Sequence, residues 1–310
     1  MTITFNKILI RLSKISLLEK LFYSFTVAIL IIIIINYNKP LYEGLNESKE
    51  FITKTNNNIY DDFYVSIYDD LVFSKNKNDY EITEIINKTA PNKNSKFLDI
   101  GSGTGHHVSS IDAHGYNVVG VDKSDAMIKK SQQTYPKLNF KREDVLNSMA
   151  FTPNSFTHIT CLYFTIYYIK EKQMFFNNCM NWLMPGGYLL LHLVDRDNFD
   201  PILPAGDPFI IVSPQKYASK RITNTTVNFN NMNYKSNFEF KPEKNESILK
   251  ETIKFKNGNV RQHEHKLYMP TQKEILTMAK DLGFKLTGKI DLLNIHYQHQ
   301  YIYVLQKPNF

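Results

Sequence analysis

The residue types best suited to bind a charged ligand gather in one short stretch, where an apolar run ends in Asp99 and glycines follow at alternate positions. Glycine has no Cβ and tolerates positive φ. A strand-to-helix turn of this kind therefore lets a ligand lie against the backbone N–H groups that open the next helix. The stretch is interpreted as a cofactor loop. Its residues are Gly101, Ser102, Gly103, Thr104 and Gly105.

A second apolar run ends in a carboxylate at Asp122. In nucleotide-binding α/β folds, an acidic side chain about 20 residues beyond the glycine loop grips ribose hydroxyls. We therefore expect Asp99 and Asp122 at one edge of a sheet, on either side of the same ligand.

The spacing of the loop resembles the first motif of class I S-adenosylmethionine-dependent methyltransferases. It reads G-x-G-x-G after Leu98-Asp99-Ile100, whereas dinucleotide folds use G-x-G-x-x-G. Residues 140–145 and 155–162 resemble the third and fourth strands of that family, and 183–191 its L-x-P-G-G turn into the fifth. The resemblance covers about residues 60–307. It departs from the family at Thr157, where relatives carry Asp.

The resemblance implies an α/β fold, a Rossmann-like doubly wound sheet of seven strands with an antiparallel last strand. Helices alternate with the strands, as such a sheet requires. Ser124 is placed to cap one helix, and Thr271 with Glu274 supplies a capping box for another. The expected helices are 80–88, 105–114, 124–135, 171–183 and the one after Pro270; the last two strands are 284–292 and 300–306.

Residues 196–269 change to short alternating runs, which predict strands at 237–240, 248–256 and 260–268. Asn257-Gly258 between the last two is a strong hairpin signal. Related enzymes often carry β-rich insertions after strand five, so this insert is expected to cover the substrate.

The family resemblance also implies S-adenosylmethionine as the cofactor and assigns roles along the loop. Asp99 would face the ammonium of its methionine tail, Asp122 the ribose, and Asp144 with the Val145 amide the adenine. Gly101 and Gly103 would permit close approach. Lys123, Met127 and Tyr68 complete the expected pocket, although core packing is the alternative for Met127 and for the Tyr68 segment.

Methyl transfer needs mainly alignment and exclusion of water, so a dedicated base is optional. If a base acts, the candidates are His192, Tyr163, Tyr167 and His265, each with packing or hydrogen bonding as the alternative. His263 and His265 share one face of a predicted strand. Two histidines without a third ligand do not make a convincing metal site, so no metal is expected.

The amino-terminal segment has no charge from residue 21 to 37, which predicts a membrane-spanning or membrane-anchoring helix. A basic amphipathic lead-in, 1–20, precedes it and a polar linker, 38–59, follows, before a catalytic domain at 60–310. A cleaved signal peptide and a buried helix are the alternatives. The charge rule favours a cytoplasmic amino terminus, but cofactor supply favours a catalytic domain facing the cytosol, and we prefer the second argument.

Composition narrows the remaining possibilities. The two cysteines, Cys161 and Cys179, are expected as buried thiols and provide no disulfide framework. The net charge of +7 is spread along the chain, which is typical of a solvated lysine-rich surface. The preferred hypothesis is a membrane-anchored methyltransferase acting on a small-molecule, lipid-like or membrane-proximal protein acceptor.

Two other hypotheses remain open. The basic charge motivates a nucleic acid methyltransferase, although Leu162-Tyr163-Phe164-Thr165 does not resemble the Asn/Asp-Pro-Pro-Tyr signature of base methylation. A cofactor-binding scaffold without turnover is the second. The sequence names neither the acceptor nor the oligomeric state.

Overall fold

The computed structural model describes residues 16–37, 50–206 and 212–309. The chain divides into two compact units, residues 1–48 and 49–310, which are described separately.

In the first unit, helix α2 spans Leu17–Tyr37. The apolar side chains of its residues 17–31 are exposed, for example Leu21 at 62%, Phe22 at 68% and Ile31 at 50%. No helix in the described part of the chain is long and apolar enough to cross a membrane. The transmembrane helix predicted at 21–37 is therefore not supported. Residues 1–15 of the predicted lead-in and 38–49 of the predicted linker lie outside the described residues.

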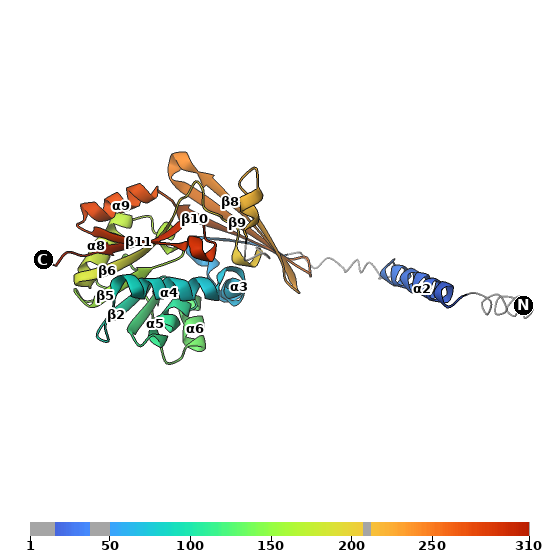
Figure 1. The fold of residues 1–310 in the computed structure, drawn as a ribbon, viewed down its shortest axis with the longest axis horizontal. Coiled ribbons are helices and arrows are strands. Elements are labelled where there is room, and N and C mark those ends of the chain that lie inside the picture. The colour runs from blue at the N-terminus through green and yellow to red at the C-terminus, as the bar shows by residue number, and fades with distance from the viewer. Residues whose placement is uncertain (1–15, 38–49, 207–211, 310) are drawn as a thin grey trace, which may run out of the picture. The chain divides into compact units, whose positions relative to one another are not determined.

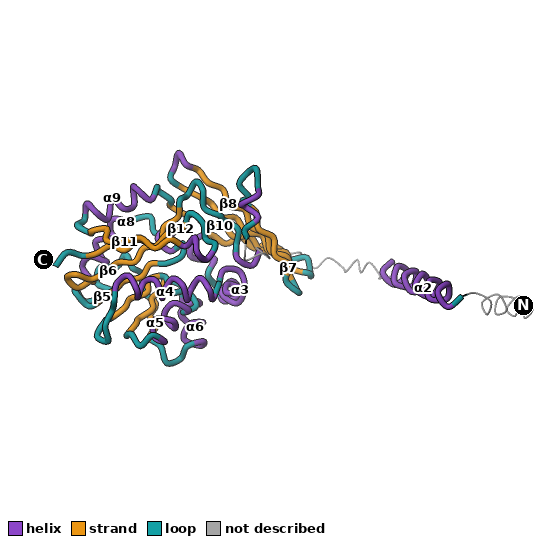
Figure 2. Tube along the Cα trace, viewed as in Figure 1, coloured by secondary structure: helices purple, strands orange, loops and turns teal. Residues whose placement is uncertain are grey.

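The second unit contains the predicted mixed sheet (Figures 1 and 2). Within the described residues it has seven strands in the order β11-β12-β6-β5-β2-β3-β4. β12 runs antiparallel to β6, as the family resemblance implies. The strands are β2 (Lys96–Ile100), β3 (Asn117–Asp122), β4 (Asn139–Arg142), β5 (Phe156–Cys161), β6 (Leu183–Val194), β11 (Lys285–Asp291) and β12 (Gln300–Gln306).

Helices cover both faces of this sheet (Figure 1). One face packs against α4 (Lys75–Thr89), α5 (His106–Ala113) and α6 (Asp125–Thr134). The other packs against α8 (Lys172–Trp182) and α9 (Gln272–Asp281). The strand period of two sends Phe97 to the first layer and Leu98 to the second, which explains the continuous apolar run of β2. Cys161 and Cys179 are buried free thiols, as predicted.

Local capping chemistry sets the helix ends as predicted. The Ser124 side chain accepts from Met127 N–H at the start of α6, and Thr271 with Glu274 forms a complete capping box on α9. Thr157, the departure from the family pattern, accepts from Lys96 N–H at 2.9 Å. It therefore joins β5 to the start of β2.

The insert forms a second sheet in the order β1-β10-β9-β8-β7. Its strands are β7 (Asn224–Asn228), β8 (Met232–Lys241), β9 (Glu246–Phe255) and β10 (Val260–Tyr268), with β1 (Phe51–Thr55) at the edge. The hairpin between β9 and β10 is confirmed, and Gly258 has φ +90°.

Strand β1 corrects the predicted linker. Residues 51–55 pair in parallel with β10, and Asn56–Ile59 form a 3-10 helix. Strand β1 covers the open edge of β10, which would otherwise present unpaired backbone groups.

Helix α3 (Asp62–Val72) packs on the insert sheet. Tyr64 and Leu71 of the helix share one apolar cluster with Tyr234 and Ile253. The predicted segment before the first central strand therefore joins the insert to the cofactor loop.

Candidate active site

A cavity of about 1240 Å³ lies in the second unit. Its walls come from the glycine loop, the end of β3, helix α3, the short helix α7 (Thr165–Tyr168) and the insert. The cavity is therefore placed at the carboxyl ends of the central strands, where open α/β sheets bind ligands.

Glycine is required at two loop positions that line the cavity. Gly101 has φ +70°, and a Cβ built on it would lie 2.5 Å from the Thr165 side chain. Gly103 has φ +53°, and its N–H donates to Asp122 Oδ2 at 3.1 Å. The second strand-end carboxylate thus fixes the conformation of the loop.

Asp99 and Asp122 lie on adjacent strands, because β2 pairs in parallel with β3 and Asp99 is opposite Gly120. Asp99 is buried; its Oδ1 accepts from Thr160 at 2.7 Å, whereas Oδ2 has no partner among the described residues. Burial raises the pKa of both carboxyl groups, and the proximity of Asp99 adds to the rise at Asp122. A cationic ligand would relieve this cost.

The expected adenosine side of the cavity is also assembled. Lys123, Met127, Asp144 and Val145 all line it. Lys123 Nζ donates to Asp144 Oδ2 at 2.7 Å, so this carboxylate already has a cationic partner. Met127 is buried and contributes both to the core and to the cavity wall.

Four predicted cofactor residues, Asp99 among them, do not line the cavity. Ser102 is buried, and Thr104 donates to Asp69 Oδ1 at 2.6 Å. A Cβ on Gly105 would lie 2.7 Å from the Phe140 ring. These three loop residues support the turn on the side away from the cavity, whereas Gly101 and Gly103 line the cavity.

Tyrosines form the wall opposite the loop. Tyr60 and Tyr168 have ring centroids 6.1 Å apart, and Tyr60 and Tyr64 have centroids 5.6 Å apart. Tyr68 is the residue closest to a Cβ built on Gly103, at 3.9 Å, and therefore lies beside the loop. The tyrosines lining the cavity are Tyr60, Tyr64, Tyr68, Tyr163, Tyr168, Tyr268 and Tyr297.

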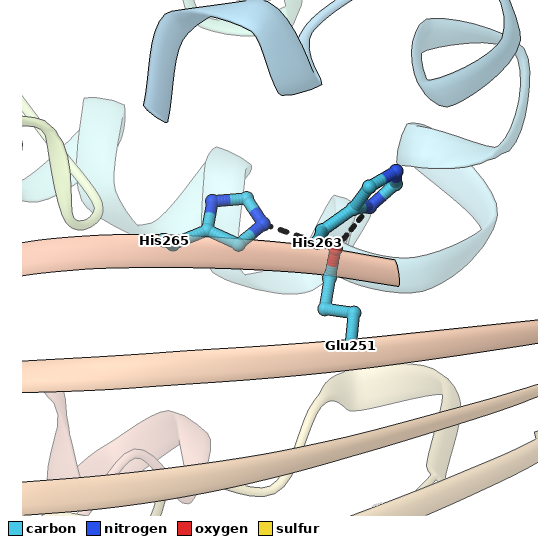
Figure 3. Close-up of side chains that lie close together, drawn as sticks. All are labelled: Glu251, His263 and His265. Carbon is cyan, nitrogen blue, oxygen red and sulfur yellow. Dashed lines mark hydrogen bonds and ion pairs between the residues drawn. The ribbon is translucent and has the colours of Figure 1, made fainter. Parts of the chain in front are cut away.

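Glu251 of β9 also contributes to the cavity wall and is 1% exposed. Figure 3 shows its carboxylate pointing between His263 and His265 of β10. Oε2 lies 2.8 Å from His263 Nδ1 and 3.0 Å from His265 Nε2. The structure thus supplies the third group that the sequence analysis did not find for this histidine pair.

These three side chains are close enough to hold a metal ion, with ligand atoms within 4.8 Å of one another. Their hydrogen bonds favour a different arrangement. Arg261 Nε donates to His263 Nε2 at 2.6 Å, so that nitrogen carries the lone pair and Nδ1 carries the proton. Metal-bound histidines normally donate from their second nitrogen, which His263 cannot do here.

The four predicted catalytic candidates divide into two groups. Tyr163 lines the cavity, and His265 contacts two cavity residues, Glu251 and Tyr168. His192 and Tyr167 are fully buried and do not line it. Burial lowers the pKa of His192 to about 4, and its Nε2 lies 3.2 Å from Gln300 Oε1. The Tyr167 hydroxyl donates to Val194 O at 3.4 Å and accepts from Val194 N–H at 2.8 Å.

Besides Tyr64, Tyr168 and Glu251, the sequence analysis missed Lys77, which lines the cavity from α4. Its ammonium pairs with Glu81, and Glu81 Oε2 lies 3.1 Å from His107 Nε2. The i,i+4 spacing of Lys77 and Glu81 was the available signal, but it usually marks an exposed helix pair.

The residues present fit S-adenosylmethionine. Its cationic groups and ribose hydroxyls need an anionic partner, and Asp122 supplies a carboxylate on the cavity wall, whereas Asp99 does not line the cavity. Its close approach needs bare backbone, which Gly101 and Gly103 provide.

Comparisons with known proteins agree with this geometry. Residues 98–191 match the family model described as "Methyltransferase domain". Phosphoethanolamine N-methyltransferase of Plasmodium falciparum is 30% identical over 172 residues, which are 52% of this chain and 63% of that protein. The chain therefore spans less than two thirds of the length of this relative.

Solved structures show the fold. An S-adenosylmethionine-dependent methyltransferase from Clostridium acetobutylicum is 15% identical, with a TM-score of 0.61 over 79% of this chain and 98% of that one. The CcbJ methyltransferase from Streptomyces caelestis is 14% identical, with a TM-score of 0.60 over 80% and 98%. The family match and the shared fold support S-adenosylmethionine as the cofactor, and the residues that match the methyltransferase family model, 98–191, lie within this fold.

Proposed function

We propose that this chain is an S-adenosylmethionine-dependent methyltransferase whose acceptor is the amine nitrogen of a small molecule. The proposal rests on one observation. The tyrosine wall and Glu251 line the same cavity as Gly101, Gly103 and Asp122, so a cofactor and a second molecule can meet there.

The chemistry of the wall favours an amine. Ammonium groups are attracted to aromatic faces and to carboxylates. Glu251 is ionised at neutral pH: burial raises its pKa, but hydrogen bonds from His263, His265 and Tyr234 hold the pKa well below its usual range. The Plasmodium relative is named for methyl transfer to an amine nitrogen, which supports the same acceptor class.

S-adenosylmethionine, when bound, supplies an electrophilic methyl group on a sulfonium. The protein has to hold the acceptor in line with that methyl group and exclude water. Tyr68 above Gly103 and the insert residues Phe238 and Leu267 supply an apolar enclosure for this purpose. Such an enclosure fits a small acceptor better than a folded RNA or protein.

The test is methyl transfer by the full chain from labelled S-adenosylmethionine to separate pools of amines, lipids, proteins and RNA. The amine pool includes phosphoethanolamine and amino sugars. We expect label in a small amine and none with Asp122→Ala. Tyr68→Phe, which keeps the ring and loses the hydroxyl, is expected to retain activity.

Two other outcomes would contradict the proposed function. Label confined to RNA or protein would contradict the acceptor class. Calorimetric binding of S-adenosylmethionine with no transfer to any pool would favour a cofactor-binding scaffold.

We further infer that the chain functions at a membrane surface, with its catalytic unit facing the cytosol. The support is the exposed apolar surface of α2, since apolar helices of this kind bury themselves in lipid interfaces. The cytosolic side is inferred from the supply of the cofactor.

Flotation of the full chain with lipid vesicles tests this location. We expect it to float, and Phe22→Glu with Phe25→Glu to abolish flotation while methyl transfer to a water-soluble amine continues. Lys20→Gln is the matched control on the same helix. Flotation unchanged by the two glutamates would contradict the role of α2, as would failure of the unaltered chain to float.

A further inference from the structure

Glu251 accepts hydrogen bonds from four side chains on three elements. Tyr64 and Tyr234 donate to Oε1 at 2.8 and 2.5 Å. His263 and His265 bind Oε2 from β10. A buried carboxylate is costly unless its lone pairs are used, and here each oxygen has two partners.

The hydrogen bonds fix the tautomer of His265. A carboxylate can only accept, so His265 Nε2 carries the ring proton that faces Glu251. Nδ1 therefore carries the lone pair, and it lies 3.0 Å from the Tyr168 hydroxyl. In His263 the corresponding lone pair already accepts from Arg261. Of these two rings, His265 is the one that can take a proton from the cavity side.

The Tyr168 hydroxyl leads from His265 to the cavity. Tyr168 donates to His265 Nδ1, and the Tyr60 ring packs beside the Tyr168 ring with the centroids 6.1 Å apart. Tyr168 itself lines the cavity. Burial raises the pKa of the Tyr168 phenol, so its hydroxyl stays neutral and passes one proton on as it receives another.

We propose that His265 is the proton acceptor for the methyl acceptor's ammonium group, reached through the Tyr168 hydroxyl, and that Glu251 is the positioning residue that holds His265 in this state. This deepens the proposed function and rests on it. The ligand class is a primary or secondary amine that arrives protonated.

The proton step balances without a further reactant. One N–H bond of the ammonium breaks and its proton passes to the oxygen of the Tyr168 hydroxyl. The proton that this hydroxyl carried before passes to His265 Nδ1. The electron pair of the broken bond stays on the nitrogen, which needs it as the nucleophile. The imidazolium formed lies 3.0 Å from the Glu251 carboxylate, so the charge does not remain unpaired in the interior.

The groups facing His265 come from every element packed against it. Tyr60 and Tyr64 have ring centroids 5.9 and 5.8 Å from its ring, and Tyr168 and His263 lie at 6.0 and 6.3 Å. Among the described residues, Glu251 is the anionic group hydrogen bonded to the ring.

The kinetic test compares His265→Gln and Glu251→Gln with the unaltered chain across pH. We expect His265→Gln to lower kcat about 100-fold at pH 7, the usual contribution of a general base. The deficit should shrink about tenfold per pH unit towards the pKa of the free amine, because the acceptor then loses its proton in solution. Glu251→Gln should show a smaller deficit with the same pH trend. His158→Gln, a buried histidine that contacts Phe97 and Tyr188, is the matched control and should show no such trend.

A second readout needs no turnover. In the full chain labelled with ¹⁵N-histidine, NMR should show His265 with its proton on Nε2 and an unprotonated Nδ1. That proton should exchange with solvent at least about tenfold faster in Glu251→Gln.

The two readouts separate the two proposals. If no pool accepts a methyl group but the NMR result holds, the proposed function fails while the arrangement of His265 stands. A proton on Nδ1, a tightly bound metal ion in the purified chain, or a kinetic deficit that is the same at every pH would overturn the inference.

Discussion

The end of the cavity at the glycine loop and the end where we propose that the acceptor binds are built by different means. The glycine-loop end is made by two glycines with positive φ and by the Asp122 carboxylate at the end of β3. The acceptor end is made by side chains from separate segments, namely Tyr60, Tyr168 and the pair of Glu251 and His265. The first should therefore be sensitive to added Cβ atoms and lost charges, and the second to hydrogen-bond partners.

Two buried glutamates repeat this contrast. Glu81 forms an ion pair with Lys77. Burial raises its pKa, but Lys77 and His107 outweigh this and lower the pKa to about 2. Glu251 instead relies on tyrosine and histidine donors. A fixed ion pair can only support structure, whereas an anion surrounded by such donors can stabilise an incoming proton.

The largest effect is expected from Asp122→Ala, which should weaken S-adenosylmethionine binding about 100-fold or more, since each hydrogen bond to a charged group contributes about 1.5–3 kcal/mol. Isothermal calorimetry measures it. The exposed Asp125 provides the control, and Asp125→Ala should bind normally. An equal loss of S-adenosylmethionine affinity in Glu251→Gln would contradict the distinction between the two ends of the cavity.

Acid should destabilise the sheet that carries the cofactor end. Burial lowers the pKa of His158 and His192 to about 4, below the ordinary value near 6.5. Both are neutral in the folded state, so their contribution is complete above pH 6.5 and is lost as pH falls towards 4. Each would contribute up to about 3 kcal/mol to the unfolding free energy. Urea unfolding at pH 7.5, 6 and 4.5 checks this, and His192→Gln should flatten the dependence. Constant stability from pH 7.5 to 4.5 would contradict it.

Backbone sensitivity is tested by two glycines with positive φ. Gly115→Ala should cost about 1 kcal/mol of stability, the usual strain of a left-handed residue, and leave cofactor binding unchanged, because a Cβ there meets nothing within 4 Å. Gly101→Ala should add a loss of affinity of about tenfold or more, because its Cβ would contact Thr165. Calorimetry measures the cofactor affinity of both variants, and thermal unfolding measures their stability. Equal cofactor affinities would show that the loop accommodates a Cβ at position 101.

The smallest effects should come from two helix caps. Ser124→Ala and Thr271→Ala should each cost about 1 kcal/mol of unfolding free energy. Only Ser124→Ala should also weaken cofactor binding by a few-fold, since Ser124 Oγ donates to Tyr60 O at 2.8 Å beside the cavity. An equal loss of cofactor affinity in Ser124→Ala and Thr271→Ala would indicate that loss of either cap affects the whole domain.

The same contrast explains what the sequence could predict. Glycine spacing and strand-end acids are local patterns, so the loop, Asp122 and the order of the central strands were predictable. Glu251 was not, because its position depends on register. A two-residue Asn257-Gly258 loop would place Thr252 opposite His263, whereas the observed pairing places Glu251 there. A shift of one residue sends every side chain to the other face. Strand β1 was not predictable either, because its sequence shows no apolar–polar alternation and its pairing partner lies far along the chain.

Strand β1 is the first paired strand of the second unit. It places Lys54 beside His263 and Thr55 beside Glu264. The strand that carries His263 and His265 is therefore closed on one side by residues from near the start of this unit. A shortened chain beginning at residue 60 would lack β1 and would leave the backbone groups along that edge of β10 unpaired.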